Sequence, residues 1–160
     1  MFYQQAADFI KNFEGFAPNA MWDVNAYRLG YGSDTITTDL NGSYRKVERG
    51  DKTTKEMASL DLQRRIKNEF EPRVKLQLGP DNYAKLPDTA KIALLSLSYN
   101  YGSITKKAIV DAAKSLDMAK LKDAIVTSTY NDNAKLGVKI QNALRARRKK
   151  EADYITLWTS

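Results

Sequence analysis

Two carboxylate residues near the amino terminus, Glu14 and Asp23, are spaced nine residues apart. Residues 2–13 carry apolar side chains at helical spacing and are followed by Gly15, which predicts a helix with Glu14 in its last turn. Asp23 is expected where a first strand begins. Two carboxylates across a groove suit glycosidic bond cleavage, because one donates a proton to the leaving oxygen while the other stabilises a cationic sugar or helps a water attack.

Glu14 suits the acid role for a physical reason. The negative end of the helix disfavours an ionised carboxyl, and Phe13 and Phe16 would exclude water from it. Taken alone, each carboxylate is better explained as an ordinary residue, since an isolated Glu at a helix end is usually solvated and Asp commonly starts turns. A carboxylate in a last helical turn nevertheless departs from the usual preference for basic residues there.

The strand expected after Asp23 is unusually bare on one face. Strand alternation places Arg28, Gly30 and Gly32 on that face and apolar or aromatic side chains on the other. Glycines in such a strand indicate close approach of a ligand or another backbone. Substrate binding and tight packing against the first helix therefore both stay open.

The composition of the 160-residue chain excludes several classes of protein. It is 42% hydrophobic and 28% charged, which is typical of a globular domain rather than a disordered or membrane-spanning chain. It contains neither cysteine nor histidine, which excludes disulfides, thiolate nucleophiles, Ser-His-Asp triads and the common zinc sites. We expect no cofactor and no metal.

The net charge of +7 comes almost entirely from one segment. Six basic residues and no acidic ones lie in Lys139–Lys150, and the rest of the chain holds 20 basic and 19 acidic residues. The segment could contact an anionic wall or membrane surface, bind nucleic acid, disrupt a membrane as a cationic helix, or form an ordinary solvated helix face. The absence of interleaved aromatic residues argues against nucleic acid.

Local signals predict an α+β fold in one domain, residues 1–160. Asn41-Gly42 predicts a type I′ hairpin, and Thr53 with Glu56 predicts a capping box that opens a helix. Pro72 should kink or restart that helix. The most apolar helix should end at Gly102, and further helices are expected at about 105–114, 117–128 and 135–156. We expect a β-containing lobe at 15–50, a connecting helix at 53–78, and a helical lobe at 80–160 packed with the N-terminal helix.

These motifs together resemble one family. The runs Phe13-Glu14-Gly15-Phe16, Trp22-Asp23 and Leu29-Gly30-Tyr31-Gly32 resemble the start of phage-type lysozymes, glycoside hydrolase family twenty-four. Tyr99-Asn100-Tyr101-Gly102 resembles the end of that family's central helix. Its closing Arg-rich helix is matched by a set of residues, Arg145, Arg147, Arg148, Glu151 and Ala152.

The resemblance implies a lysozyme-like fold, mostly helical, with a small antiparallel β-hairpin lobe and a larger helical lobe. It implies cleavage of the β-1,4 bond between N-acetylmuramic acid and N-acetylglucosamine in peptidoglycan, with Glu14 as general acid and Asp23 assisting water or stabilising the cationic transition state. It also places Tyr99 and Asn100 in the substrate groove. A buried tyrosine and a helix C-cap are the alternative explanations for these two residues.

The chain departs from the family at two positions. Arg28 stands where the family has a threonine that helps hold the attacking water, and Ser33 stands where it has a histidine. An arginine cannot accept a proton. Either Ser33 or Thr35 supplies the missing hydroxyl, or the enzyme is a lytic transglycosylase, in which the sugar's own hydroxyl attacks. The expected substrate-binding residues are Arg28, Gly30, Gly32, Ser33, Thr35, Tyr99 and Asn100.

The amino-terminal residues show no signal peptide. The resemblance implies a bacteriophage protein made in the host cytoplasm, which reaches the wall in the periplasm through a holin pore or in the virion. We expect peptidoglycan as partner, no nucleic acid, and a monomer.

Overall fold

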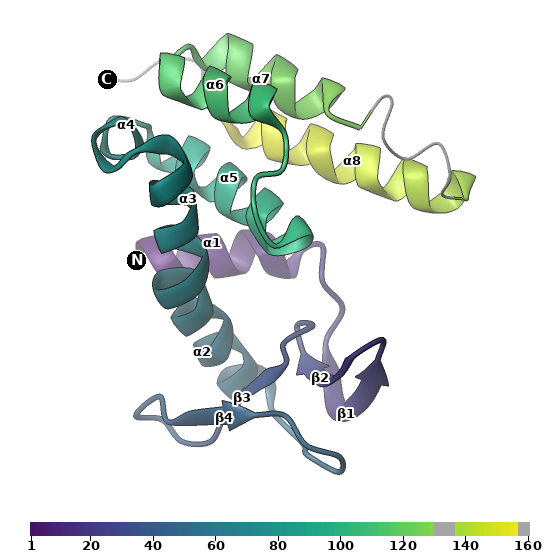
Figure 1. Cartoon of the computed structure of the whole chain (residues 1–160). Helices are drawn as coiled ribbons and strands as arrows, with labels where there is room; N and C mark the ends of the chain where they lie inside the picture. The colour runs from purple at the N-terminus through teal and green to yellow at the C-terminus, as the bar shows by residue number, and fades with distance from the viewer. Residues whose placement is uncertain (130–136, 157–160) are drawn as a thin grey trace. The chain divides into compact units, whose positions relative to one another are not determined.

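A computed structural model describes residues 1–129 and 137–156. The chain divides into two compact units, residues 1–69 and 70–160. Within the described residues, helices predominate and two small antiparallel sheets lie in the first unit (Figure 1). The predicted α+β class is therefore confirmed. The packing of the helical lobe against the N-terminal helix stays a prediction.

The first unit contains two β-hairpins and the helices that precede and follow them. Helix α1 (Phe2–Lys11) precedes β1 (Ala17–Asp23) and β2 (Ala26–Gly30), which pair with each other. Strands β3 (Thr35–Thr37) and β4 (Tyr44–Lys46) form the second hairpin, and β3 packs on helix α2 (Lys55–Arg65). A small apolar core under the strands consists of Leu29, Ile36 and Val47.

The positions of both carboxylates relative to these elements differ from the prediction. Helix α1 ends at Lys11, because the next turn tightens, with the Phe13 amide donating to the Ile10 carbonyl at 3.0 Å. Glu14 therefore lies beyond the helix, and its placement in the last helical turn was wrong. Asp23 ends β1 instead of beginning it, since the strand already starts at Ala17.

The β3–β4 hairpin forms around Asn41-Gly42 as expected, but its turn is not type I′. That turn needs positive φ at both central residues, whereas Asn41 is not among the described non-glycine residues with positive φ. The Asp39 carboxylate instead accepts hydrogen bonds from the amides of Asn41 (2.9 Å) and Ser43 (3.1 Å). This side-chain bonding favours a longer connection.

The helix signals hold with small shifts. Thr54, not Thr53, caps α2, with its hydroxyl accepting from the Met57 amide at 3.2 Å. The helix passes into a π-helical turn, η1 (Ile66–Phe70), and α3 (Glu71–Leu78) begins with Pro72 in its first turn. The predicted restart at Pro72 is thus confirmed. The π-helical turn carried no signal in the sequence.

The second unit is helical throughout its described part. After α4 (Pro80–Ala84), helix α5 (Asp88–Tyr101) is buried from residue 92 to 98 and ends at Gly102, as predicted. Helices α6 (Lys107–Ser115), α7 (Met118–Thr127) and α8 (Val138–Tyr154) follow, and α8 packs on α5 and α7. The predicted start of the last helix near residue 135 lies outside the described residues. In the described chain, no helix is long and apolar enough to span a bilayer.

Candidate active site

The two candidate catalytic carboxylates flank a single strand. Glu14 is half-buried in the turn that leads from α1 into β1. Asp23 is the last residue of β1, and its side chain is 63% exposed. Because β1 connects the two groups, the hydrogen bonds that hold this strand also determine the positions of Glu14 and Asp23.

Hydrogen bonds hold the outer edge of β1. The Ala20 amide donates to the Asp51 carbonyl, and the Thr53 amide donates to the Pro18 carbonyl, both at 2.8 Å. The other edge of β1 pairs with β2. The strand is therefore bonded on both sides over part of its length, which restricts the backbone that carries Asp23.

Arg28 lies beside Asp23. Its Nε is 3.5 Å from Oδ2 of Asp23, and its Nη1 donates to the Gly32 carbonyl at 3.4 Å. Met21 pairs with Arg28 in the ladder, so Arg28 and Asp23 lie on one face of the hairpin. The residue at the family's threonine position thus contacts the candidate catalytic aspartate directly.

The hydroxyls of Ser33 and Thr35 point toward a buried carboxylate, Asp61 of α2. Ser33 Oγ donates to Asp61 at 2.6 Å and accepts from the Thr35 amide and from Arg65. Thr35 Oγ1 donates to Asp61 at 3.1 Å and accepts from Arg64 at 2.7 Å. Both hydroxyls are therefore engaged inside the unit, and their contact with substrate stays a prediction.

Gly30 and Gly32 lie in a tight turn rather than along a continuous strand face. β2 ends at Gly30, and Leu29 pairs with Ser33 across the turn, where φ is +62° at Gly30 and +83° at Gly32. A Cβ atom at Gly30 would lie 3.0 Å from the Cβ of Ala58. Close packing is thus present at Gly30, but its partner is α2 and not the first helix. Substrate contact by either glycine is untested.

Tyr99 and Asn100 belong to the last turn of α5 in the second unit, and both are half-buried. The Tyr99 ring lies 5.2 Å from that of Phe70. The cap of α5 is Gly102, so Asn100 is not the C-cap. Its buried Oδ1 accepts no hydrogen bond from the described residues. The role of both residues in substrate binding stays a prediction.

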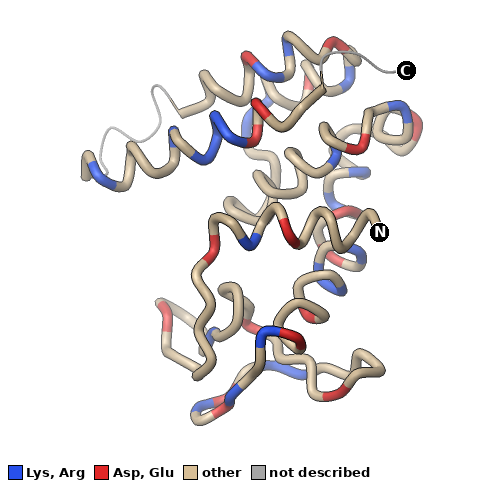
Figure 2. Tube along the Cα trace, turned by 180° about the vertical axis from the view of Figure 1, so that it is seen from behind, with Lys and Arg blue, Asp and Glu red and all other residues tan. Residues whose placement is uncertain are grey.

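The basic segment Lys139–Lys150 is not a uniformly solvated helix face. Arg148 is fully buried, and its Nη2 donates to Glu151 at 3.0 Å, while the buried Arg147 donates to the Ser96 carbonyl at 3.1 Å. Burial raises the pKa of Glu151 although both arginines oppose this. The exposed basic residues of the segment are Lys139, Arg145, Lys149 and Lys150. Figure 2 shows basic positions, in blue, along α8.

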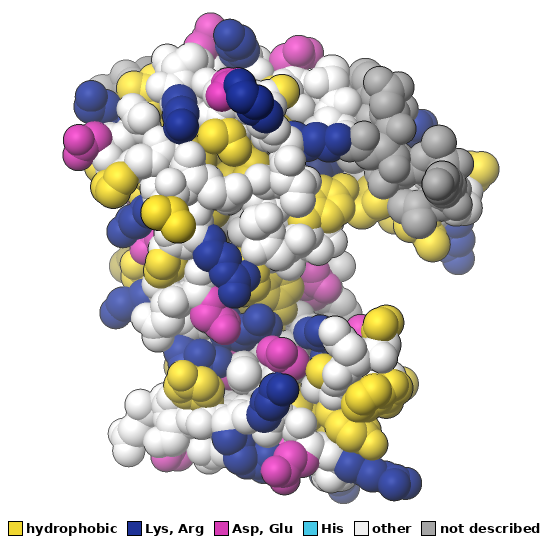
Figure 3. Space-filling view, in the orientation of Figure 1, with side chains coloured by type: hydrophobic (Ala, Val, Ile, Leu, Met, Phe, Trp, Pro, Cys, Tyr) yellow, Lys and Arg dark blue, Asp and Glu magenta, His cyan; other side chains and the backbone are white. Residues whose placement is uncertain are grey.

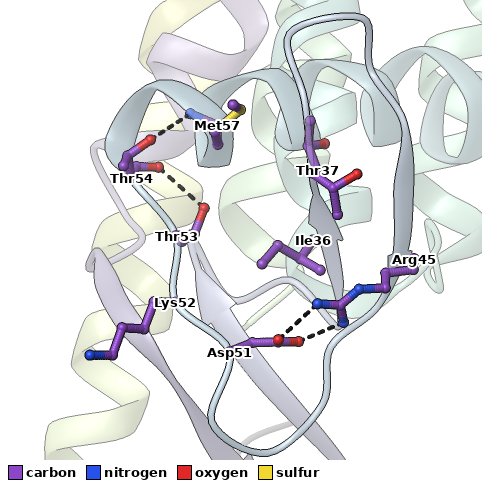
Figure 4. A pocket seen from close by; sticks show the side chains of 9 residues that line it. Ile36, Thr37, Arg45, Asp51, Lys52, Thr53, Thr54 and Met57 are labelled. Carbon is purple, nitrogen blue, oxygen red and sulfur yellow. Dashed lines mark hydrogen bonds and ion pairs between the residues drawn. The ribbon is translucent and has the colours of Figure 1, made fainter.

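A cleft that the sequence did not predict lies between the β3–β4 hairpin and the start of α2 (Figure 4). Its volume is about 340 Å³, and Ile36 and Met57 contribute apolar walls. Arg45 and Asp51 form a two-pronged ion pair across it, with both distances 2.8 Å, and this hydrogen bonding lowers the pKa of Asp51 to about 2. Neither candidate catalytic carboxylate lines this cleft.

No group of three or more acidic side chains in the described part of the chain could hold a metal ion. Chemistry carried by carboxylates alone is compatible with this arrangement, since glycosidic cleavage needs only two such groups.

Comparison with known protein families gives a match over most of the chain. The model of the phage lysozyme family matches residues 11–151, a range that runs from before Glu14 to Glu151. No curated protein matches the chain. The chain therefore belongs to the phage lysozyme family of glycosidases, which degrade the peptidoglycan of the bacterial cell wall.

Proposed function

We propose that this enzyme hydrolyses the β-1,4 bond between N-acetylmuramic acid and N-acetylglucosamine, with Glu14 as the general acid. Asp23 stabilises the cationic transition state or assists the attacking water. The observation that carries this proposal is the position of the two carboxylates at either end of β1, inside the range that matches the family.

The surroundings of the two carboxylates support different roles. Glu14 is half-buried, and its sequence neighbours Phe13 and Phe16 each pack against another aromatic ring, at 5.2 and 5.5 Å. A half-buried position suits a group that donates a proton to a bound substrate. Asp23 is exposed and lies next to a guanidinium, which suits a carboxylate that faces a developing positive charge.

A lytic transglycosylase is the second candidate, and one observation favours it. Ser33 and Thr35 already use their hydroxyls for Asp61, so neither is available to replace the family's threonine in holding a water. In a transglycosylase the sugar's own hydroxyl attacks and leaves an anhydro end, so no ordered water is required. The hydrolytic route then depends on Asp23 alone.

Replacing Glu14 with glutamine tests the acid role, because the amide keeps the shape and has no proton to donate. We expect Glu14→Gln to slow the clearing of a peptidoglycan suspension by about 10²–10⁴-fold. Glu56→Gln, at an exposed glutamate in the first turn of α2, is the matched control and should retain full activity. Full activity of Glu14→Gln would contradict the proposal.

Mass spectrometry of digested peptidoglycan distinguishes the two candidate reactions. Hydrolysis leaves reducing ends, and transglycosylation leaves anhydro ends. We expect reducing ends. Anhydro products would assign the enzyme to the second class while leaving Glu14 as its acid.

For delivery, we propose that the enzyme acts in the periplasm as a monomer, released by a holin or carried in the virion. The exposed basic residues of α8 would hold it near an anionic wall. Sedimentation of the purified chain tests the monomer, and salt-dependent retention on sacculi tests the electrostatic contact.

A further inference from the structure

The tip of the β1–β2 hairpin exposes large apolar side chains. Trp22 is 62% exposed and Val24 is 89% exposed, on either side of Asp23. Figure 3 shows hydrophobic side chains gathering over this hairpin. Tryptophan is highly buried in most soluble proteins, so an exposed one within an apolar patch indicates an interaction surface.

The Trp22 ring is held in place from the inside. Trp22 and Tyr27 are direct partners in the ladder, and their rings meet edge to face with centroids 5.2 Å apart. Tyr27 in turn packs against the apolar core formed by Leu29, Ile36 and Val47. The outer part of the Trp22 ring is thus presented to solvent by a supported side chain, which lowers the entropy lost on binding.

Val24 breaks a local rule at the same place. It follows Asp23 in the turn between β1 and β2 with φ at +55°, a conformation that is strained for a β-branched residue. A glycine would adopt it freely. Because the Val24 side chain is almost fully exposed, burial within the fold does not account for a valine there.

The exposed ring and the candidate catalytic aspartate lie on opposite faces of the hairpin. Trp22 shares its face with Tyr27, whereas Asp23 shares its face with Arg28. A sugar chain cleaved at Asp23 would therefore not be the one that lies on the Trp22 ring.

We propose that Trp22, Val24 and Tyr27 form a docking platform for the sugar rings of a second glycan strand of the cell wall. The proposal rests on the function proposed above. The apolar face of a pyranose ring packs on aromatic side chains, and a wall offers many neighbouring strands. A second contact raises the effective concentration of substrate at the site that cleaves it.

Charge favours a sugar over the other occupants of such a surface. Residues 1–69 contain 10 basic and 10 acidic residues, so this unit has no net attraction for a polyanion or an anionic bilayer. Asp23 lies between Trp22 and Val24 in the chain and would oppose insertion of the tip into lipid. Binding of the sugar backbone of peptidoglycan needs neither a net positive charge on this unit nor the transfer of Asp23 into lipid.

Binding to purified sacculi tests the platform without cleavage if every variant also carries Glu14→Gln. We expect Trp22→Ala to weaken binding about tenfold, and Trp22→Tyr to keep most of it, because loss of an aromatic contact is worth about 1.4 kcal/mol. Leu40→Ala removes a side chain that is 66% exposed on the other hairpin and is the matched control, expected within about twofold of its parent. Equal binding by Trp22→Ala and its parent would overturn the platform.

Kinetics and fluorescence separate this platform from the proposed catalytic site and from a membrane contact. In the active enzyme, Trp22→Ala should raise the KM for sacculi about tenfold and leave the KM for a short soluble glycan fragment nearly unchanged. Equal losses on both substrates would place Trp22 at the proposed catalytic site and overturn the platform. With Trp158→Phe, Trp22 is the only tryptophan, and its emission should shift with sacculi. A shift with anionic phospholipid vesicles and none with sacculi would also overturn it. Release of soluble glycan by the Glu14→Gln parent would contradict the catalytic assignment, whereas equal binding by Trp22→Ala and its parent without such release would contradict the platform alone.

Discussion

Asp61 is a buried carboxylate that links β3 to α2 in the first unit. It is 2% exposed, and four side chains donate to it, from Ser33, Thr35, Thr37 and Arg64, at 2.6 to 3.2 Å. Three of these donors come from the segment that includes β3, and Arg64 comes from α2 itself. Asp61→Asn preserves the side-chain volume and removes the charge.

The expected loss of stability follows from these contacts. Each hydrogen bond to a charged group is worth about 1.5–3 kcal/mol, but asparagine keeps one acceptor oxygen, and contributions within a network do not add. Its amide group would also face hydroxyl and guanidinium donors, leaving Arg64 without its carboxylate. Breaking a buried ion pair by removing one partner costs about 3–5 kcal/mol, and we expect Asp61→Asn to lower the free energy of unfolding by that amount.

Urea unfolding, followed by circular dichroism, measures the effect. With a slope of about 2 kcal/mol per molar urea, the midpoint should fall by about 1.5–2.5 M. Asp8→Asn is the matched control, since Asp8 is 60% exposed and forms an ion pair with Lys11 on the surface of α1, so the loss of stability should stay below about 1 kcal/mol. If Asp61→Asn cost no more than the control, the network would not hold β3 on α2 as argued.

The remaining predictions concern packing, pH and buried charge. Gly30→Ala should lower the free energy of unfolding, measured in urea, by about 2–4 kcal/mol, because the new Cβ adds backbone strain and overpacks against Ala58. Gly42→Ala is the control: its Cβ would meet no described atom within 4 Å, so backbone strain alone should cost about 1–2 kcal/mol. The ion pair with Arg45 lowers the pKa of Asp51 from 3.8 to about 2, so ionised Asp51 stabilises the fold fully above about pH 4. This stabilisation is lost as the pH falls through about 2. Asp51→Asn should therefore lower Tm near pH 6 and lower it much less near pH 2. Glu151→Gln removes the charge that compensates the buried Arg148, and it should lower the free energy of unfolding, measured by thermal melts, by about 3–5 kcal/mol. Asp153→Asn, at an exposed ion pair of the same helix, should lower it by less than about 0.5 kcal/mol. Equal losses would contradict a stabilising role for the buried Glu151.

The elements of the fold could be predicted where a single local rule determines the backbone. Gly102 adopts a φ of +88° and ends α5. Pro72 lacks the amide that an uninterrupted helix needs, so a new helix, α3, begins beside it. The end of α1 could not be read this way, because apolar spacing continues to Phe13 while the backbone already tightens after Lys11. Periodicity indicates which face is buried and not where the last hydrogen bond is made.

The network around Asp61 has a partial signal in the sequence. Ser33, Thr35 and Thr37 are spaced two residues apart, so a strand places their hydroxyls on one side. An aspartate in a helix between Leu60 and Leu62 is a candidate acceptor for such a row. The pairing itself could not be foreseen, because it joins residues 24 to 28 positions apart through tertiary packing.

The two departures from the family pattern are explained by two different networks. Ser33, at the family's histidine position, is a buried donor to Asp61, so it contributes to the fold of the first unit. Arg28, at the family's threonine position, contacts Asp23 on the exposed face of the hairpin. Only Arg28 therefore bears directly on the candidate catalytic groups. Because a guanidinium cannot accept a proton from water, the choice between hydrolysis and transglycosylation depends on whether Asp23, held beside Arg28, activates a water by itself.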